Sequence, residues 1–278
     1  MVSNGVCWTP HFLYRLLGQA VQTSDKNPSD PSPTPVSFNI QYDLPTHIDT
    51  AVPVTRFVDR STVHGYSSWS KEPQICVHDN RGIKMKVVSV LGSPRENGNS
   101  STIVNRFCTT AEKFGAEAKT YVLNSLDYRG CQGCFICKTK LDRCVLEDDL
   151  TEVLDAVRGT DVLVLASPVY YWDISGQLKC FMDRTFSYLV PDFITNPVKS
   201  RLAPGKKLIF ILAQNNPDPN SFPDIFRKFD YFFKAYGFAE RHLIRAFGVN
   251  EPGEVEKQED VMKLAEETAE KVCGCISF

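Results

Sequence analysis

Residues 84–101 read KMKVVSVLGSPRENGNSS, and this stretch decides the fold. Its first half, Met85 to Leu91, is an apolar, Val-rich run typical of a strand covered on both faces. Gly92 to Asn99 is polar and rich in turn residues, and from Ser100 to Phe114 apolar residues recur at helical spacing. A strand, a polar loop and a helix in direct succession predict the opening unit of an α/β domain.

The same alternation continues along the chain. Further strands are predicted at 118–123, 161–166, 207–213 and 241–247. Helices are predicted at 149–157, 174–189, 222–236 and 254–272. Residues 161–166, DVLVLA, are almost wholly apolar, as a strand buried on both faces should be. Strands that alternate with helices therefore favour a doubly wound, five-stranded parallel sheet.

The chain divides near residue 84. Residues 1–80 hold 8 of the 17 prolines, and their apolar residues follow neither the strand nor the helix period for long. We expect residues 1–83 to form an irregular, extended, Pro-rich arm that is partly disordered. Residues 84–278 are predicted to form the α/β domain.

The composition argues against several classes of partner. A formal net charge of −2 gives no general attraction to nucleic acid. No apolar run approaches the roughly 20 residues that span a bilayer, and no basic patch followed by an apolar stretch marks a secretory signal. We therefore expect a cytoplasmic protein without a membrane span or a nucleic-acid partner.

Ligands of doubly wound sheets bind beyond the carboxyl ends of the strands. The first such loop, 92–101, offers hydroxyl groups, an arginine and two glycines at a helix N-terminus, which suits a phosphate. It lacks the lysine of a nucleoside-triphosphate loop and the three spaced glycines of a dinucleotide loop, so a monophosphate is predicted. An ordinary Gly/Asn turn with a serine cap is the alternative.

Residues 167–173, SPVYYWD, follow the third predicted strand and contain three consecutive aromatic residues. Such side chains could flank a flat heteroaromatic ring. They could equally form an apolar lid on the next helix or on a second subunit. The polar loop 214–223 follows the fourth strand and could line the rim of the same pocket.

Four of the ten cysteines form a Cys-x2-Cys-x2-Cys-x6-Cys pattern at Cys131, Cys134, Cys137 and Cys144. The first three lie on one short turn, so their sulfurs can converge on one inorganic centre, as in cubane iron–sulfur clusters. Three alternatives stay open: no metal, a structural zinc ion, or a redox-active disulfide.

Three motifs in order, LGSPRENGNSS, a cysteine loop ending in CVLEDDL, and ASPVYYWDISGQLKCFMDR, resemble the NADPH-dependent FMN reductase branch of the flavodoxin-like superfamily. The cysteine loop is similar to that of the iron–sulfur flavoproteins. The resemblance covers about residues 84–273 and implies a flavodoxin-like fold, FMN and a [4Fe-4S] cluster at the four cysteines. It assigns the FMN phosphate to Ser93, Arg95, Asn97, Asn99, Ser100 and Ser101. It assigns the isoalloxazine ring to Pro168, Val169, Tyr170, Tyr171 and Trp172.

The resemblance implies an FMN-dependent oxidoreductase or electron-transfer flavoprotein with the cluster next to the flavin. The flavin carries the chemistry, so no catalytic residue of the chain is named. The implied donor is NAD(P)H or ferredoxin, the acceptor a quinone, an oxygen species or a protein, and the assembly a homodimer or homotetramer. A cluster-free NAD(P)H-dependent FMN or quinone reductase is one alternative. A flavodoxin-type electron carrier or a zinc-stabilised interaction module is another.

Overall fold

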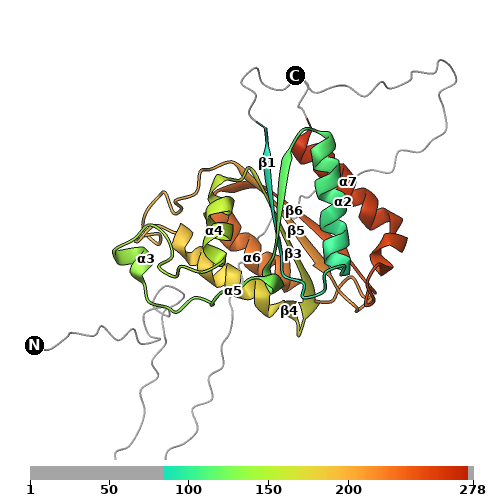
Figure 1. Cartoon of the computed structure of the whole chain (residues 1–278), viewed down its shortest axis with the longest axis horizontal. Coiled ribbons are helices and arrows are strands. Elements are labelled where there is room, and N and C mark those ends of the chain that lie inside the picture. Colours follow the sequence, from blue (N-terminus) through green and yellow to red (C-terminus); the bar gives the residue numbers. More distant parts are fainter. Residues whose placement is uncertain (1–83, 275–278) are drawn as a thin grey trace, which may run out of the picture. The chain divides into compact units, whose positions relative to one another are not determined.

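The computed structural model describes residues 84–274, so the predicted N-terminal arm over residues 1–83 lies outside the described residues. The elements are β1 (Lys86–Leu91), α2 (Asn99–Lys113), β2 (Glu117–Val122), α3 (Ile136–Thr139), α4 (Leu150–Gly159), β3 (Val162–Tyr170), β4 (Asp173–Ile174), α5 (Gly176–Arg184), β5 (Lys206–Ala213), α6 (Asp224–Ala235), β6 (Phe238–Ala246) and α7 (Glu259–Cys273). Three short 3₁₀ turns are η1 (Leu123–Ser125), η2 (Thr185–Tyr188) and η3 (Glu254–Lys257) (Figure 1).

Five strands pair in parallel in the order β2-β1-β3-β5-β6, and the two-residue β4 pairs antiparallel with β3. The prediction of a doubly wound, five-stranded parallel sheet is thereby confirmed. From β1 the chain moves outward to β2 on one side and then crosses to β3 on the other. The winding direction therefore reverses between β1 and β3, where ligands of such sheets bind.

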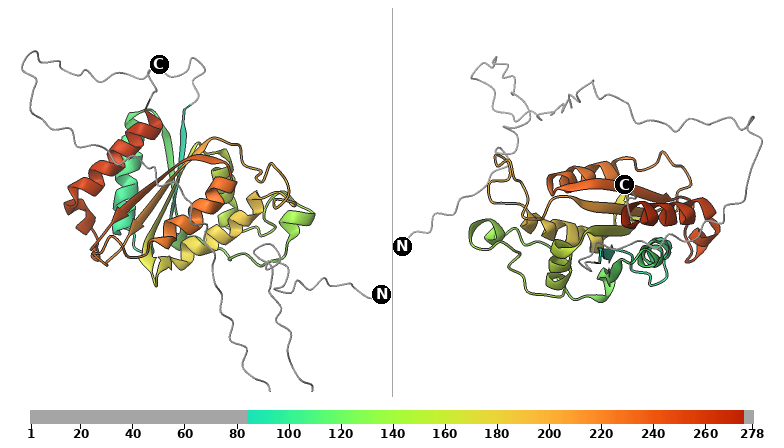
Figure 2. Two further views of the ribbon diagram at one scale, coloured as in Figure 1. Left: turned by 180° about the vertical axis from the view of Figure 1, so that it is seen from behind. Right: turned by 90° about the horizontal axis from the view of Figure 1, so that it is seen from above.

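Helices cover both faces of the sheet, with α2 and α7 on one face and α4, α5 and α6 on the other (Figures 1 and 2). Alternate residues of β3 serve the two faces. Val162 and Val164 join the core under α2 and α7, whereas Leu163 and Leu165 join the core under α4, α5 and α6. This alternation explains why the strand is apolar throughout, because both of its faces are buried.

The segment after the third strand differs from its prediction as a loop. Strand β3 continues past Ala166 to Tyr170 and turns back into β4, with Val169 opposite Ile174. The turn consists of Tyr171 and Trp172, whose φ angles of 47° and 66° are both left-handed. The composition of this segment predicts a loop, but the structure has a two-residue hairpin turn, which requires left-handed φ angles.

Two predicted helices are shorter than their apolar patterns. Helix α5 begins at Gly176 because Ser175 caps it, its hydroxyl oxygen accepting the Leu178 N–H. It ends at Arg184, where the chain tightens into η2. The final helical pattern is divided between η3 and α7. Within residues 84–274 no helix has both the length and the apolar character needed to cross a membrane.

Candidate functional site

The ends of β1 and β3 are bound together at the point where the winding reverses. The Gly92 N–H donates to the Ala166 oxygen over 2.8 Å, and the Ser175 hydroxyl donates to the Gly92 oxygen over 2.7 Å. A Cβ atom at Gly92 would lie 2.6 Å from Leu178 Cβ and from Ser175 Oγ. Only glycine fits here, and the start of α5 is fixed against the first loop as a result.

Hydroxyl groups of the first loop gather at the N-terminus of α2. Ser93, Ser100 and Ser101 are all buried. The Thr102 N–H donates to the Gly98 oxygen over 3.0 Å, and the N–H groups that precede it at the start of α2 have no intrahelical acceptor. A Cβ atom at Gly98 would lie 2.9 Å from Ser93 Oγ, so the loop is tightly closed. Free donors and the helix dipole together favour an anion.

Arg95 and Asn99 join this loop to a distant segment. The Asn99 amide donates to the Glu251 oxygen over 3.0 Å and accepts the Val255 N–H over 3.0 Å. The Arg95 guanidinium donates to the Asn250 oxygen. Both side chains thus anchor the predicted phosphate loop. Nothing local in the sequence marks this contact, because it spans about 150 residues.

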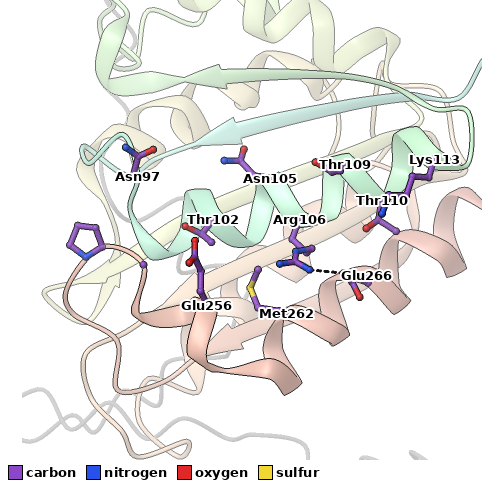
Figure 3. A pocket seen from close by; sticks show the side chains of 12 residues that line it. Asn97, Thr102, Asn105, Arg106, Thr109, Thr110, Lys113, Glu256, Met262 and Glu266 are labelled. Carbon is purple, nitrogen blue, oxygen red and sulfur yellow. Dashed lines mark hydrogen bonds and ion pairs between the residues drawn. The ribbon is translucent and has the colours of Figure 1, made fainter.

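Asn97 is exposed and lines a groove that does not include the buried serines. It lies at one end of a groove of about 560 Å³ between α2 and α7 (Figure 3). The groove has polar walls and is bridged by an ion pair of 2.8 Å between Arg106 and Glu266. Asn97 is the only residue of the predicted phosphate set that lines this groove. The groove runs along the side of α2, apart from the buried serines.

The aromatic residues of the β3–β4 hairpin project from the sheet. Tyr171 is 95% exposed, Trp172 is 71% exposed and Tyr170 is also exposed, whereas Pro168 and Val169 are half-buried. The Trp172 ring meets the Phe222 ring edge to face, with centroids 5.9 Å apart. Large apolar side chains in such positions are available to a planar ligand.

The polar loop after β5 is held from the neighbouring strand. Gln214 is buried and donates from Nε2 to the Asn216 oxygen over 2.9 Å. Arg245 of β6 donates to Gln214 Oε1 over 2.5 Å and to the Ser221 oxygen over 2.6 Å. The loop is therefore ordered by the side chain of Arg245, which the sequence prediction did not include.

All four predicted metal-ligating cysteines line one cavity of about 580 Å³, whose walls come from the cysteine loop, α5, η2 and α6. Cys131 and Cys134 are exposed, and Cys137 and Cys144 are half-buried. Gly133, with φ of +61°, supplies a left-handed turn between the first cysteines. Across residues 84–274 no three His, Cys, Asp or Glu side chains converge closely enough to hold a metal ion.

Two cations bind the cysteine loop to η2. Lys138 donates from Nζ to the Phe186 oxygen over 2.6 Å and to the Leu189 oxygen over 2.7 Å. Burial lowers the pKa of Lys138 to about 8. Arg201 donates to the Cys137 oxygen over 3.0 Å. Lys138 adjoins a cysteine of the motif, but no sequence signal connects Arg201 with the loop.

Residues 85–211 match the model of the NADPH-dependent FMN reductase family. An iron–sulfur flavoprotein from Archaeoglobus fulgidus is 38% identical over 104 residues, which are 37% of this chain and 47% of that protein. One from Methanocaldococcus jannaschii is 33% identical over 121 residues, or 44% of this chain and 62% of that protein. The chain thus spans about half to three fifths of the length of these relatives.

Among solved structures, the chain is similar to an NAD(P)H:quinone oxidoreductase from Methanothermobacter marburgensis, with a TM-score of 0.55 and 13% identity. That likeness covers 70% of this chain and 100% of the other. An FMN-dependent NADH-azoreductase from Bacillus anthracis, in complex with FMN, has a TM-score of 0.54 at 16% identity and covers 68% and 100%. Identities this low show the fold alone. Over residues 85–211 the chain is thus similar to the NADPH-dependent FMN reductase family, and the described domain has the flavodoxin-like fold.

Proposed function

We propose that the protein is an FMN-dependent oxidoreductase that moves electrons between a bound flavin and a [4Fe-4S] cluster at Cys131, Cys134, Cys137 and Cys144. One observation carries this proposal: in a domain that is similar to the FMN reductase family over residues 85–211, a compact cysteine motif lines a single cavity beside α5. Two relatives that match 104 and 121 residues of the chain are named iron–sulfur flavoproteins, which supports the same function here.

The residues of the first loop fit a flavin monophosphate. Three buried serines at the N-terminus of α2 offer neutral donors, and the first-turn N–H groups add to them. The exposed Tyr171 and Trp172 suit the apolar flanks of a planar ring. When bound, FMN would supply the redox chemistry by accepting hydride or single electrons. The chain's part is to hold the phosphate, flank the ring and exclude water from it.

The residues of the cavity fit an anionic cluster. Thiolate ligands make such clusters negatively charged. Two cationic residues are near: Arg184 lines the cavity, and Lys138 directly follows Cys137 in the chain. Phe186 and Phe193 pack edge to face at 5.8 Å in its wall and limit the access of water. The sulfurs have to converge on binding. Because Cys131 and Cys134 are exposed, that movement does not disturb the core.

We extend the proposal to the partners implied by the family. NAD(P)H or ferredoxin is the donor, and a quinone, an oxygen species or a protein is the acceptor. The protein works in the cytoplasm as a homodimer or homotetramer. Neither the donor nor the acceptor requires a catalytic acid or base from the chain, since the flavin carries the reaction.

Cysteine variants test the cluster. We expect Cys134→Ser to lose most of its iron while it keeps FMN, because the variant removes one of four ligands. Cys180→Ser is the matched control, since Cys180 is half-buried on α5 and does not line the cavity. Equal iron content in wild type and Cys134→Ser would contradict the ligand assignment. Loss of iron in Cys180→Ser would contradict the choice of these four cysteines.

A cluster-free NAD(P)H-dependent FMN or quinone reductase is the second candidate. It is favoured by the separation of the cysteine sulfurs within residues 84–274, where no metal-binding group is assembled. Steady-state NAD(P)H oxidation with a quinone acceptor separates the two. Full turnover by FMN-loaded Cys134→Ser would favour the second candidate, and turnover that depends on iron would favour the first. Bound FMN without turnover in the wild type would indicate an electron carrier.

A further inference from the structure

Arg184 is an arginine in the protein core. It is the last residue of α5 and is 1% exposed, and it is among the largest fully buried side chains of the described domain. A buried charge is unfavourable unless ion pairs and hydrogen bonds compensate it. The partners of its guanidinium therefore indicate which segment of the chain Arg184 stabilises.

The partners of Arg184 lie at both ends of the cysteine loop. The guanidinium forms a two-pronged ion pair with the Asp148 carboxylate, at 2.8 and 3.2 Å. It also donates to the Arg129 oxygen over 2.9 Å and to the Leu146 oxygen over 3.1 Å. Arg129 precedes Cys131, whereas Leu146 and Asp148 follow Cys144. One side chain thus binds both ends of the segment that carries all four cysteines.

Asp148 completes this closure from the other direction. Its carboxylate accepts the Arg129 N–H over 3.1 Å. Both backbone polar groups of Arg129 are therefore held by the Arg184–Asp148 pair. Bidentate arginine–carboxylate pairs fix geometry as well as charge. This ion pair between buried Arg184 and half-buried Asp148 closes the base of the cysteine loop.

One donor of Arg184 is left over. Its Nε–H is buried and has no hydrogen-bond partner within the described residues. The hydroxyl of Ser187, in the same cavity wall, is also buried without a partner. Unpaired buried donors in one wall indicate that a bound group completes the cavity.

We propose that Arg184 is the positioning residue of the cysteine loop: it closes the loop through Asp148, and its unpaired Nε–H is the donor for a group bound in the cavity that Arg184 and the four cysteines line together. By donating this N–H to a sulfur of the centre that the cysteines hold, it raises the reduction potential of that centre, because hydrogen bonds to the sulfurs stabilise the reduced, more negative state. The inference deepens the proposed function and rests on it where it concerns the potential. The closure of the cysteine loop by Arg184 and Asp148 does not depend on the proposed cluster.

Four variants separate positioning from simple stability. Arg184→Met leaves the half-buried Asp148 charge without its partner and is expected to lower the stability of the fold. The double variant Arg184→Met with Asp148→Asn removes both charges together, which keeps the fold stable enough to study. Arg184→Lys keeps the charge but loses the planar fork. Arg106→Met, which removes an exposed cation of α2, is the control.

Two measurements read out the effect. Hydrogen exchange of residues 130–145 is measured in metal-free protein, and the reduction potential is measured by anaerobic titration of the iron-containing protein. We expect the double variant to exchange roughly tenfold faster in this segment and to have a more negative potential. Arg184→Lys should lie between it and the wild type, and Arg106→Met should match the wild type.

The outcomes separate this inference from the proposed function. An iron-containing double variant with the wild-type potential and wild-type exchange would overturn the role of Arg184 alone. A wild-type protein without iron would overturn the proposed cluster and, with it, the effect on the potential. In that case faster exchange in the double variant would still support the closure of the loop, and unchanged exchange would overturn it.

Discussion

Replacing Tyr171 by asparagine should stabilise the protein and weaken its binding of FMN. Tyr171 occupies the first position of a two-residue hairpin turn with φ of 47°, and its side chain is 95% exposed. Such turns prefer Asn-Gly, because a left-handed residue with a Cβ is strained by about 1 to 2 kcal/mol and asparagine tolerates this conformation better. Because the Tyr171 ring buries little surface, its loss costs little stability, and we expect the relief of backbone strain to raise the free energy of unfolding.

The expected gain in the free energy of unfolding is about 1 kcal/mol, or roughly 2 to 4 °C in Tm for a domain of this size. Loss of one aromatic flank should weaken FMN binding by about 1 kcal/mol, which is roughly fivefold in Kd. Urea unfolding of the flavin-free protein gives the first quantity. Quenching of FMN fluorescence on binding gives the second.

Tyr231→Asn is the matched control, since Tyr231 is also an exposed tyrosine but lies in the right-handed helix α6. It should not gain stability and should bind FMN as the wild type does. A Tyr171→Asn variant less stable than the wild type would refute the argument from strain. Unchanged FMN affinity would refute the assignment of this hairpin to the flavin ring.

Further predictions concern the first loop and the buried ion pair. Gly92→Ala should lower the free energy of unfolding by about 1 to 3 kcal/mol, because its Cβ would lie 2.6 Å from atoms of Leu178 and Ser175; urea unfolding checks this. Ser93→Glu with Ser100→Glu should abolish FMN retention through repulsion of the phosphate, and a variant that keeps its flavin on gel filtration would show that the phosphate lies elsewhere. Burial raises the pKa of Asp148, but hydrogen bonds from Arg184 and from the Arg129 N–H have the larger, opposite effect, so its pKa lies below the ordinary value. Its stabilising effect is therefore complete above about pH 4 and is lost as the pH falls through the native pKa, so the wild type should lose more stability than Asp148→Asn between about pH 5 and 2.

The sequence sufficed where local pattern and burial agree. Residues 161–166 read as a strand buried on both faces, and β3 has that position between β1 and β5. The turn-rich stretch 92–99 predicted a loop between a strand and a helix, and it joins β1 to α2. Each of these features depends on neighbours within a few residues. Periodicity and turn chemistry are sufficient in such cases.

The sequence did not suffice where the deciding contact is distant. The role of Asn99 depends on Glu251 and Val255, and the burial of Arg184 depends on Asp148 and the backbone of Arg129. An arginine in the last turn of a helix is usually solvated, so its position in the core follows from tertiary structure alone. The β3–β4 hairpin was missed for another reason, because Tyr-Trp is a poor sequence for a left-handed turn.

The central claim is that this chain carries FMN and a [4Fe-4S] cluster together. The most direct test measures flavin, iron and zinc on one anaerobically purified sample of the full chain, with its absorption spectrum. We predict roughly one FMN and four iron atoms per chain, and flavin bands on a broad iron–sulfur shoulder. Flavin bands with iron near zero would contradict the cluster, and zinc without flavin would contradict the claim as a whole.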